Sequence, residues 1–197
     1  MKRVFFILAF ILSVFFLLPV GGWAEESAAR IHSVQADFRQ EKQLEILARP
    51  IISSGTFVFQ APQSLRWEYL SPVHSILLVH GGKVRRFIER NGEFREERDM
   101  APGAMQVVLT EIANWLEGRF TDNTLFTVSS QDKGIIRLVP REKGLAALIT
   151  SIELKLADQF GLLDEVTIFE GPGSFTRLTF SNRILNEEIP LSTFTAR

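Results

Sequence analysis

The chain of 197 residues has no cysteine and only three histidines, His32, His74 and His80. The lack of cysteine excludes disulfide bonds, a thiol nucleophile and cysteine metal sites. No pair of histidines has a metal-binding spacing such as His-Glu-x-x-His, and the chain has neither a Gly-x-Ser-x-Gly motif nor a phosphate-binding glycine-rich loop. We therefore expect no enzymatic activity and no metal.

The chain also lacks an excess of charge of either sign. It has 22 Lys and Arg residues against 23 Asp and Glu residues, which gives a formal net charge of −1. Proteins that bind nucleic acid usually carry a basic excess that neutralises phosphates. The charge balance therefore predicts that nucleic acid is not a partner.

Tyrosine is scarce and phenylalanine is abundant. One tyrosine stands against 17 phenylalanines, and hydrophobic residues make up 46% of the chain. Phenylalanine has no polar group, so its rings form broad apolar surfaces without hydrogen bonds to satisfy. This composition favours either a large core or an apolar surface that binds a ligand.

The start of the chain has the pattern of a cleaved secretory signal. Two basic residues precede an apolar run at 4–18, and Gly22 and Ala24 are small residues at the −3 and −1 positions of a cleavage site. A membrane anchor is the weaker alternative, because spanning a bilayer takes about 20 apolar residues. We predict a signal peptide at 1–24 and one domain at 25–197, exported as a soluble protein to the periplasm.

Residues 55–69 predict a β-hairpin with one strongly apolar face. Pro62 marks the turn, because it cannot donate a hydrogen bond to a β-ladder. Aromatic and aliphatic side chains occupy every second position of the flanking strands: Phe57, Phe59, Leu65, Trp67 and Tyr69. Arg66 and Glu68 fall on the opposite face of the second strand.

Similar alternation predicts about ten strands. They cover residues 34–46, 51–60, 65–69, 74–80, 83–90, 93–98, 125–130, 135–139, 151–157, 163–170 and 174–182. Residues 99–118 instead predict an amphipathic helix that ends at Gly118, with its apolar stripe formed by Met105, Val108, Leu109, Ile112, Trp115 and Leu116. One helix among so many strands favours a large curved sheet, a sandwich or a barrel whose open side the helix plugs.

Several motifs follow one another in a distinctive order. They are Val34-x-Ala36-x-Phe38-x-Gln40, Gly55-x-Phe57-x-Phe59, Pro62-x-x-Leu65-Arg66-Trp67-x-Tyr69, Phe175-x-x-Leu178-x-Phe180-Ser181-Asn182 and Ile189-Pro190-x-x-x-Phe194. In this order, over essentially the whole mature chain, they resemble the periplasmic outer-membrane lipoprotein carriers, the LolA-like proteins. The family has an arginine just before the turn proline that helps to hold a lid, whereas this chain has Ala61.

The resemblance implies a mainly β fold, an antiparallel incomplete β-barrel with an α-helical lid over an apolar cavity. It also implies no cofactor and no catalysis. Members of the family take acylated lipoproteins from an inner-membrane release complex and hand them to an acceptor at the outer membrane. We therefore expect an acylated lipoprotein or another lipid as cargo, and we expect a monomer.

The acyl chains of the cargo are expected to lie between sheet and helix. The residues predicted to line this site are Phe38, Phe57, Phe59, Leu65, Trp67, Leu77 and Val79 from the sheet and Val108, Leu109, Ile112 and Trp115 from the helix. Burying a long acyl chain contributes on the order of 10 kcal/mol, at about 0.8 kcal/mol per CH₂. The chain therefore needs a shield to cross water.

Other interpretations stay open. The apolar stripe and the hairpin face can simply be core, which is the default for such patterns. The cargo can be a glycolipid or a free lipid used in envelope assembly. The scaffold can be a regulatory module that senses mislocalised lipoprotein and binds a partner protein. An enzyme is the weakest alternative, and it would depend on His74 or His80.

Overall fold

The structure describes most of residues 31–195. The computed structural model describes residues 31–62, 64–97, 108, 111–112, 114–115, 123–131, 134–158 and 162–195. The predicted signal peptide at 1–24 and most of the predicted helix at 99–118 lie outside the described residues.

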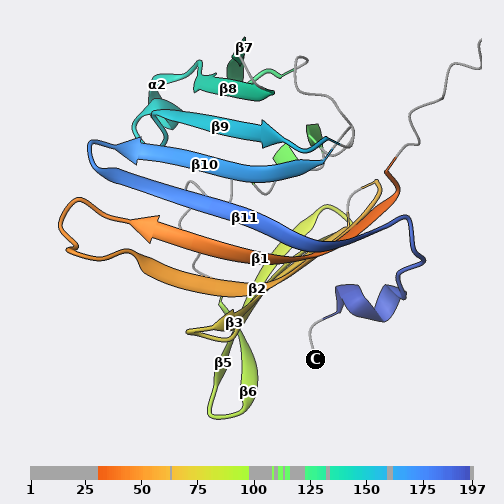
Figure 1. The fold of residues 1–197 in the computed structure, drawn as a ribbon. Helices are drawn as coiled ribbons and strands as arrows, with labels where there is room; N and C mark the ends of the chain where they lie inside the picture. The colour runs from red at the N-terminus through yellow and green to blue at the C-terminus, as the bar shows by residue number, and fades with distance from the viewer. Residues whose placement is uncertain are drawn as a thin grey trace, which may run out of the picture.

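The described residues form one antiparallel sheet of eleven strands (Figure 1). The strands are β1 (Ser33–Gln43), β2 (Ile51–Gln60), β3 (Ser64–Ser71), β4 (Ser75–His80), β5 (Lys83–Arg90), β6 (Glu93–Glu97), β7 (Phe126–Gln131), β8 (Ile135–Pro140), β9 (Ser151–Leu156), β10 (Leu163–Gly171) and β11 (Ser174–Leu185). Two short helices, α2 (Lys143–Ala146) and the 3₁₀ helix η1 (Leu191–Phe194), were not predicted. The mainly β, antiparallel and incompletely closed fold is confirmed.

The sheet consists of two meanders joined in the middle. Its strand order is β6-β5-β4-β3-β2-β1-β11-β10-β9-β8-β7. The first and last strands therefore pair with each other, with Phe38 opposite Phe180. Within the described part of the chain, β6 and β7 are the outer strands and do not pair, so the sheet stays open.

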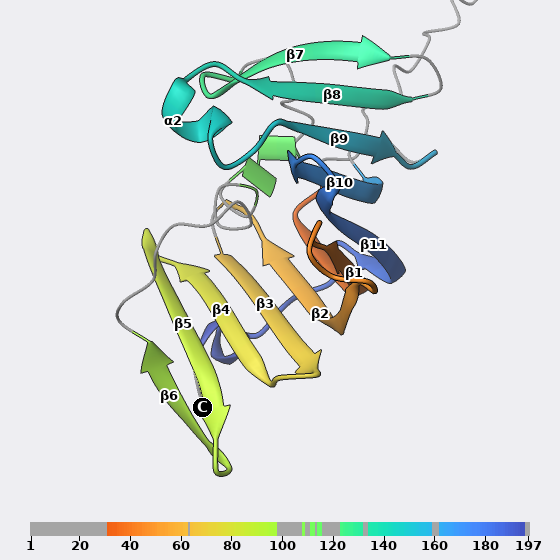
Figure 2. The ribbon, with the colours of Figure 1, turned by 90° about the vertical axis from the view of Figure 1, so that its left-hand side faces the viewer.

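The sheet is curved, and the helical residues lie against its concave face. Figure 2 shows β7–β9 at one end of the curved sheet and β2–β6 at the other. Five described residues between β6 and β7 are helical: Val108, Glu111, Ile112, Asn114 and Trp115. Because three of them are apolar and at most 3% exposed, this short stretch has one buried face, as the stripe predicted.

A glycine allows β2 and β3 to approach each other closely. Gly55 on β2 lies between Phe38 on β1 and Tyr69 on β3. A Cβ atom on Gly55 would lie 1.8 Å from the carbonyl oxygen of Glu68. The two flanking rings meet edge to face, with their centroids 5.1 Å apart. Only glycine fits at this point of the sheet.

A β-bulge interrupts β11 near its end. Asp37 pairs with Ser181 and Gln35 with Ile184, so β11 has one residue more than β1 over this interval. Asn182 has a left-handed φ of 50°, and its side-chain amide donates a 2.7 Å hydrogen bond to the carboxylate of Asp37. An extra residue shifts the alternation of the strand, so Arg183 comes to the inner face.

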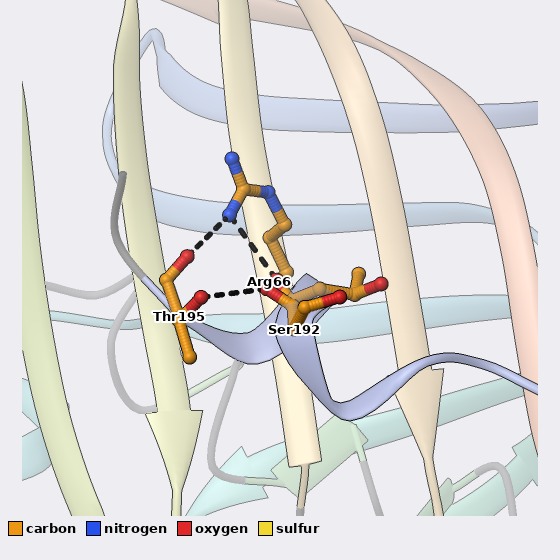
Figure 3. Close-up of a pocket in the computed structure, with 4 residues that line it drawn as sticks. Arg66, Ser192 and Thr195 are labelled. Carbon is orange, nitrogen blue, oxygen red and sulfur yellow. Dashed lines mark hydrogen bonds between the residues drawn. The ribbon is translucent and has the colours of Figure 1, made fainter.

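The C-terminal segment returns over the outer face of the sheet. Ile189 and Phe194 are buried against Val58 of β2. Arg66 points outward, as the alternation predicted, and its Nη1 donates to the carbonyl oxygens of Thr193 (3.2 Å) and Thr195 (3.1 Å). Arg66 and the segment line a polar pocket of about 270 Å³ (Figure 3).

Candidate functional site

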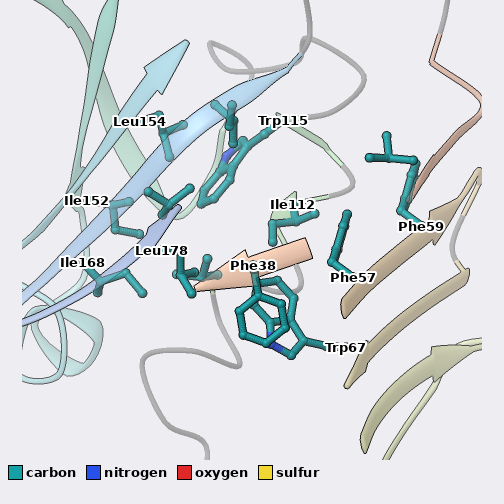
Figure 4. Packing of buried hydrophobic residues seen from close by; sticks show 14 of the residues in the cluster. Phe38, Phe57, Phe59, Trp67, Ile112, Trp115, Ile152, Leu154, Ile168 and Leu178 are labelled. Atoms are coloured by element: carbon teal, nitrogen blue, oxygen red, sulfur yellow. The ribbon is translucent and has the colours of Figure 1, made fainter. Parts of the chain in front are cut away.

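The predicted site residues that the structure describes belong to one apolar cluster on the inner face of the sheet (Figure 4). The buried members are Phe38, Phe57, Phe59, Leu65, Trp67, Val108, Ile112 and Trp115, while Leu77 and Val79 are partly buried against them. Leu109 lies outside the described residues. The predicted faces of the strands and of the helical stripe therefore converge, although a role in binding lipid stays a prediction.

Trp67 is the centre of the aromatic part of this cluster. Its side chain is 0% exposed, and it lies between Phe57 on β2 and Leu77 on β4. Its ring centroid is 4.5 Å from that of Phe38, 5.3 Å from that of Phe57 and 6.1 Å from that of Phe180. The rings are tilted or edge to face, which are the favourable arrangements for aromatic pairs.

The second half of the sheet contributes residues that the prediction missed. Ile152, Leu154, Ile168 and Leu178 are fully buried in the same cluster. Figure 4 shows Ile112 and Trp115 lying between these residues and the aromatic group of Phe38, Phe57 and Trp67. The alternation of residues 151–157 was the signal that could have added this half to the site.

A small apolar cavity lies between Ile112 and the inner face of the sheet. It has a volume of about 30 Å³ and is lined by Val34, Ala36, Phe57, Ile112, Leu162, Leu163, Phe180 and Arg183. A cavity of this volume can hold a water molecule but is far too small for an acyl chain. Room for an acyl chain at this place therefore requires that the helical residues move away from the sheet.

Among the described residues that line this cavity, Arg183 is the one that carries a charge. Its Nη2 donates to the carbonyl oxygen of Leu163 at 2.8 Å and to the carboxylate of Asp164 at 3.0 Å. The side chain of Arg183 is 23% exposed and that of Asp164 is 42% exposed. Solvent therefore reaches this side of the cavity, which the sequence analysis did not identify.

Tyr69 adds a neutral hydroxyl beside the aromatic group. It donates a 2.7 Å hydrogen bond to the side-chain oxygen of Gln40. Burial raises the pKa of Tyr69 to about 12, because a phenolate would be poorly solvated there. The inner face therefore gains no negative charge from this residue at neutral pH.

The strongest ionic network lies on the outer face of the sheet. Glu68 accepts hydrogen bonds from Arg66 Nε (2.8 Å) and from His74 Nε2 (2.7 Å), and His74 Nδ1 lies 2.5 Å from Glu89. The hydrogen bond to Glu68 is the main cause that raises the pKa of His74. Burial alone would raise the pKa of Glu68, but the hydrogen bonds from Arg66 and His74 outweigh it and lower that pKa.

Both histidines considered for catalysis have packing partners. His74, just before β4, links β3 and β5 through Glu68 and Glu89, and its ring lies edge-on to Phe94. His80 stacks on Phe194 with a centroid distance of 5.8 Å and shares a hydrogen bond with Ser64. No group of three or more His, Asp or Glu side chains among the described residues is arranged to hold a metal ion. In the same part of the chain, no helix is both long and apolar enough to cross a membrane.

Solved structures provide a first comparison. A DUF1329 family protein from Desulfovibrio piger superposes with a TM-score of 0.46 at 9% identity, covering 85% of this chain and 91% of that one. A LolA superfamily protein from Nitrosomonas europaea has a TM-score of 0.41 at 9% identity, covering 83% and 90%.

Sequence comparison gives a closer match. An outer-membrane lipoprotein carrier protein from Methylococcus capsulatus is 30% identical over 147 residues, which cover 68% of this chain and 68% of the relative. The family described as outer membrane lipoprotein carrier protein LolA matches residues 29–197. This match spans every described strand, including the pairing of β1 with β11 that joins the two halves of the sheet. The chain therefore belongs to the LolA family of outer-membrane lipoprotein carrier proteins.

Proposed function

We propose that the protein is a periplasmic carrier that binds the acyl chains of lipoproteins and ferries them from the inner to the outer membrane. One observation carries the proposal: a single apolar cluster joins sheet residues such as Trp67 to the helical residues Ile112 and Trp115. The family match and the Methylococcus capsulatus relative support lipoproteins as the class of cargo.

The packing of the cluster supports reversible binding. In the structure, Val108, Ile112 and Trp115 pack against the inner face of the sheet and are buried there. When an acyl chain enters, the lipid takes the place of these three side chains against the sheet. Both states remove apolar surface from water, so the net gain from loading is smaller than the full transfer energy of the lipid. A carrier needs this balance in order to release its cargo.

Membership of the family supports the proposed transfer route. The protein would receive cargo from an inner-membrane release complex and pass it to an acceptor at the outer membrane, and it would act as a soluble monomer without catalysis. The predicted signal peptide at 1–24 supports the location.

Native mass spectrometry of the protein purified from the envelope of its own host tests the proposal. We expect an acylated adduct on the wild-type protein. We expect Ile112→Asp to lose it, because a carboxylate cannot pack against the apolar sheet. Val139→Asp is the matched control, since Val139 is 41% exposed on β8 and should tolerate the charge.

A measurement on the wild-type protein alone removes the dependence on variants. An apolar fluorescent probe should bind, and added acyl lipid should displace it. If the purified protein has no adduct and lipid displaces no probe, the cluster is an ordinary core and the carrier proposal is wrong.

A further inference from the structure

We propose that Arg183 binds the carbonyl oxygen of the ester or amide that joins an acyl chain to the rest of the cargo. This inference rests on the proposed function, and it assigns a protein group to the polar end of the lipid. Arg183 is the charged residue in the lining of the apolar cavity, and its side chain is partly exposed.

The backbone places Arg183 there through the bulge in β11. Without the extra residue, the alternation that brings Phe180 inward would bring Asn182 inward and turn Arg183 to the outer face. The bulge between Ser181 and Ile184 reverses this order, and the hydrogen bond from Asn182 to Asp37 holds it. Bulges often redirect a side chain at a functional site.

The guanidinium of Arg183 has more N–H groups than its protein acceptors occupy. Arginine has five N–H groups, and Nη2 of Arg183 donates to Leu163 and Asp164. Among the described residues, no other acceptor contacts the guanidinium. None of its nitrogen atoms is among the described side-chain atoms that are buried without a hydrogen-bond partner, so water can bind the remaining N–H groups, and a ligand oxygen would replace that water.

The surroundings of Arg183 favour a neutral oxygen over an anion. The carboxylate of Asp164, 3.0 Å away, offsets much of the positive charge. The rest of the lining is apolar, with Phe57, Ile112 and Phe180 around the place where an alkyl tail would lie. The first polar group that follows an alkyl tail is its carbonyl, which would then lie beside Arg183 at the side that solvent reaches.

An ester and an ether that share the same chain test this inference. The probes are 1-monopalmitoylglycerol and 1-O-hexadecylglycerol, which differ in the carbonyl group. Displacement of an apolar fluorescent probe from the mature protein gives both affinities. We expect the wild-type protein to bind the ester about tenfold more tightly, since a hydrogen bond from a charged donor has this effect.

The variant Arg183→Met should abolish the preference for the ester while it keeps its affinity for the ether. Retained ether binding shows that the variant is folded and that its cavity is intact. Arg183→Lys should keep a reduced preference. Asp164→Asn should increase the affinity for palmitate, because it removes the charge that offsets Arg183.

Other outcomes would contradict the role of Arg183 or the proposed carrier function. If Arg183→Met keeps the wild-type preference, or if the wild-type protein has none, Arg183 does not bind the carbonyl. If wild-type protein prefers palmitate to both neutral probes, the site recognises an anion instead. If neither neutral probe nor palmitate binds, the proposed carrier function fails together with this inference.

Discussion

At the scale of single residues, Gly55 gives the sharpest prediction. Gly55→Ala should destabilise the protein by about 3 kcal/mol or more, since overpacking against a rigid backbone cannot relax. The new methyl group would lie 1.8 Å from the carbonyl oxygen of Glu68, which is fixed in the β-ladder. Urea denaturation measures the loss.

Gly144→Ala is the matched control. Gly144 lies in α2, and a Cβ there would have no atom within 4 Å. In a helix, alanine is more stable than glycine by roughly 0.5–1 kcal/mol. Equal losses in the two variants would contradict the close contact assigned to Gly55.

The single tyrosine allows a direct test of burial. The phenol of Tyr69 should titrate near pH 12 instead of near its ordinary value of 10.0, because burial disfavours the phenolate. The contribution of Tyr69 to the free energy of unfolding is fully present below pH 10 and is lost as the pH rises towards 12. Ultraviolet absorbance of the phenolate follows one residue only, and Tyr69→Phe should remove the signal. A midpoint near 10 in folded protein would show that the hydroxyl is accessible.

The contrast between Trp67 and Arg183 shows how far sequence alone predicts the site. The inward face of residues 55–69 could be read because the alternation there has no interruption. Arg183 could not be placed, since the bulge at Asn182 reverses the alternation and depends on a contact with Asp37 on a distant strand.

At the scale of elements, the outer network should make stability depend on pH. Both ring nitrogens of His74 face carboxylates, an arrangement that requires the protonated imidazolium. The raised pKa means that its contribution is complete below the ordinary value of 6.5 and is lost as the pH rises through the folded-state pKa. Glu68, with its lowered pKa, acts in the opposite sense, and its contribution is lost as the pH falls below 4.5.

His74→Gln isolates the histidine contribution. The urea midpoint of the wild-type protein should fall as the pH rises through neutrality, and the variant should show a smaller fall. His32 and His80 are present in both proteins, so the difference reports His74 alone. Parallel curves would mean that the network does not hold a charged histidine.

The C-terminal segment should depend on Arg66 for its attachment. Arg66→Met removes the hydrogen bonds to Thr193 and Thr195, at a cost of about 1–3 kcal/mol. Hydrogen exchange of η1 and its flanks should accelerate more than exchange of β1. Arg85→Met is the control, because the carboxylate partner of Arg85 is Glu96 on β6 and not the C-terminal segment.

The two unpredicted helices show the limit of pattern recognition at this scale. Both α2 and η1 contain four residues, and neither has a side-chain hydrogen bond at its N-cap. Such helices are too short to display an apolar repeat. The place of η1 instead depends on tertiary contacts, chiefly the burial of Phe194.

At the scale of the whole molecule, two tryptophans report on either side of the proposed site. Trp67 belongs to the sheet and Trp115 to the helical residues, and both are fully buried. An acyl chain carrying bromine should quench both if it lies between them. The variants Trp67→Phe and Trp115→Phe separate the signals, since Trp23 lies in the predicted signal peptide. Quenching of neither residue would place the lipid elsewhere.

The overall strand order lay beyond the sequence prediction. Turns between neighbouring strands indicate hairpins, so they account for the pairing of strands that follow one another in the sequence. Nothing in the alternation indicates that β1 pairs with β11, since this pairing joins segments about 140 residues apart along the chain. The curvature of the sheet and the convergence of both halves on Ile112 depend on that pairing.

The same pairing sets the time at which the chain can fold. The partner of β1 is the last strand to be synthesised, so a growing chain lacks the strand that unites its halves. Contacts between distant segments slow folding into the range of milliseconds to seconds. A chain that folds only after β11 is complete remains unfolded while it is being made. Such a chain can be threaded through a narrow protein-conducting channel before its structure forms.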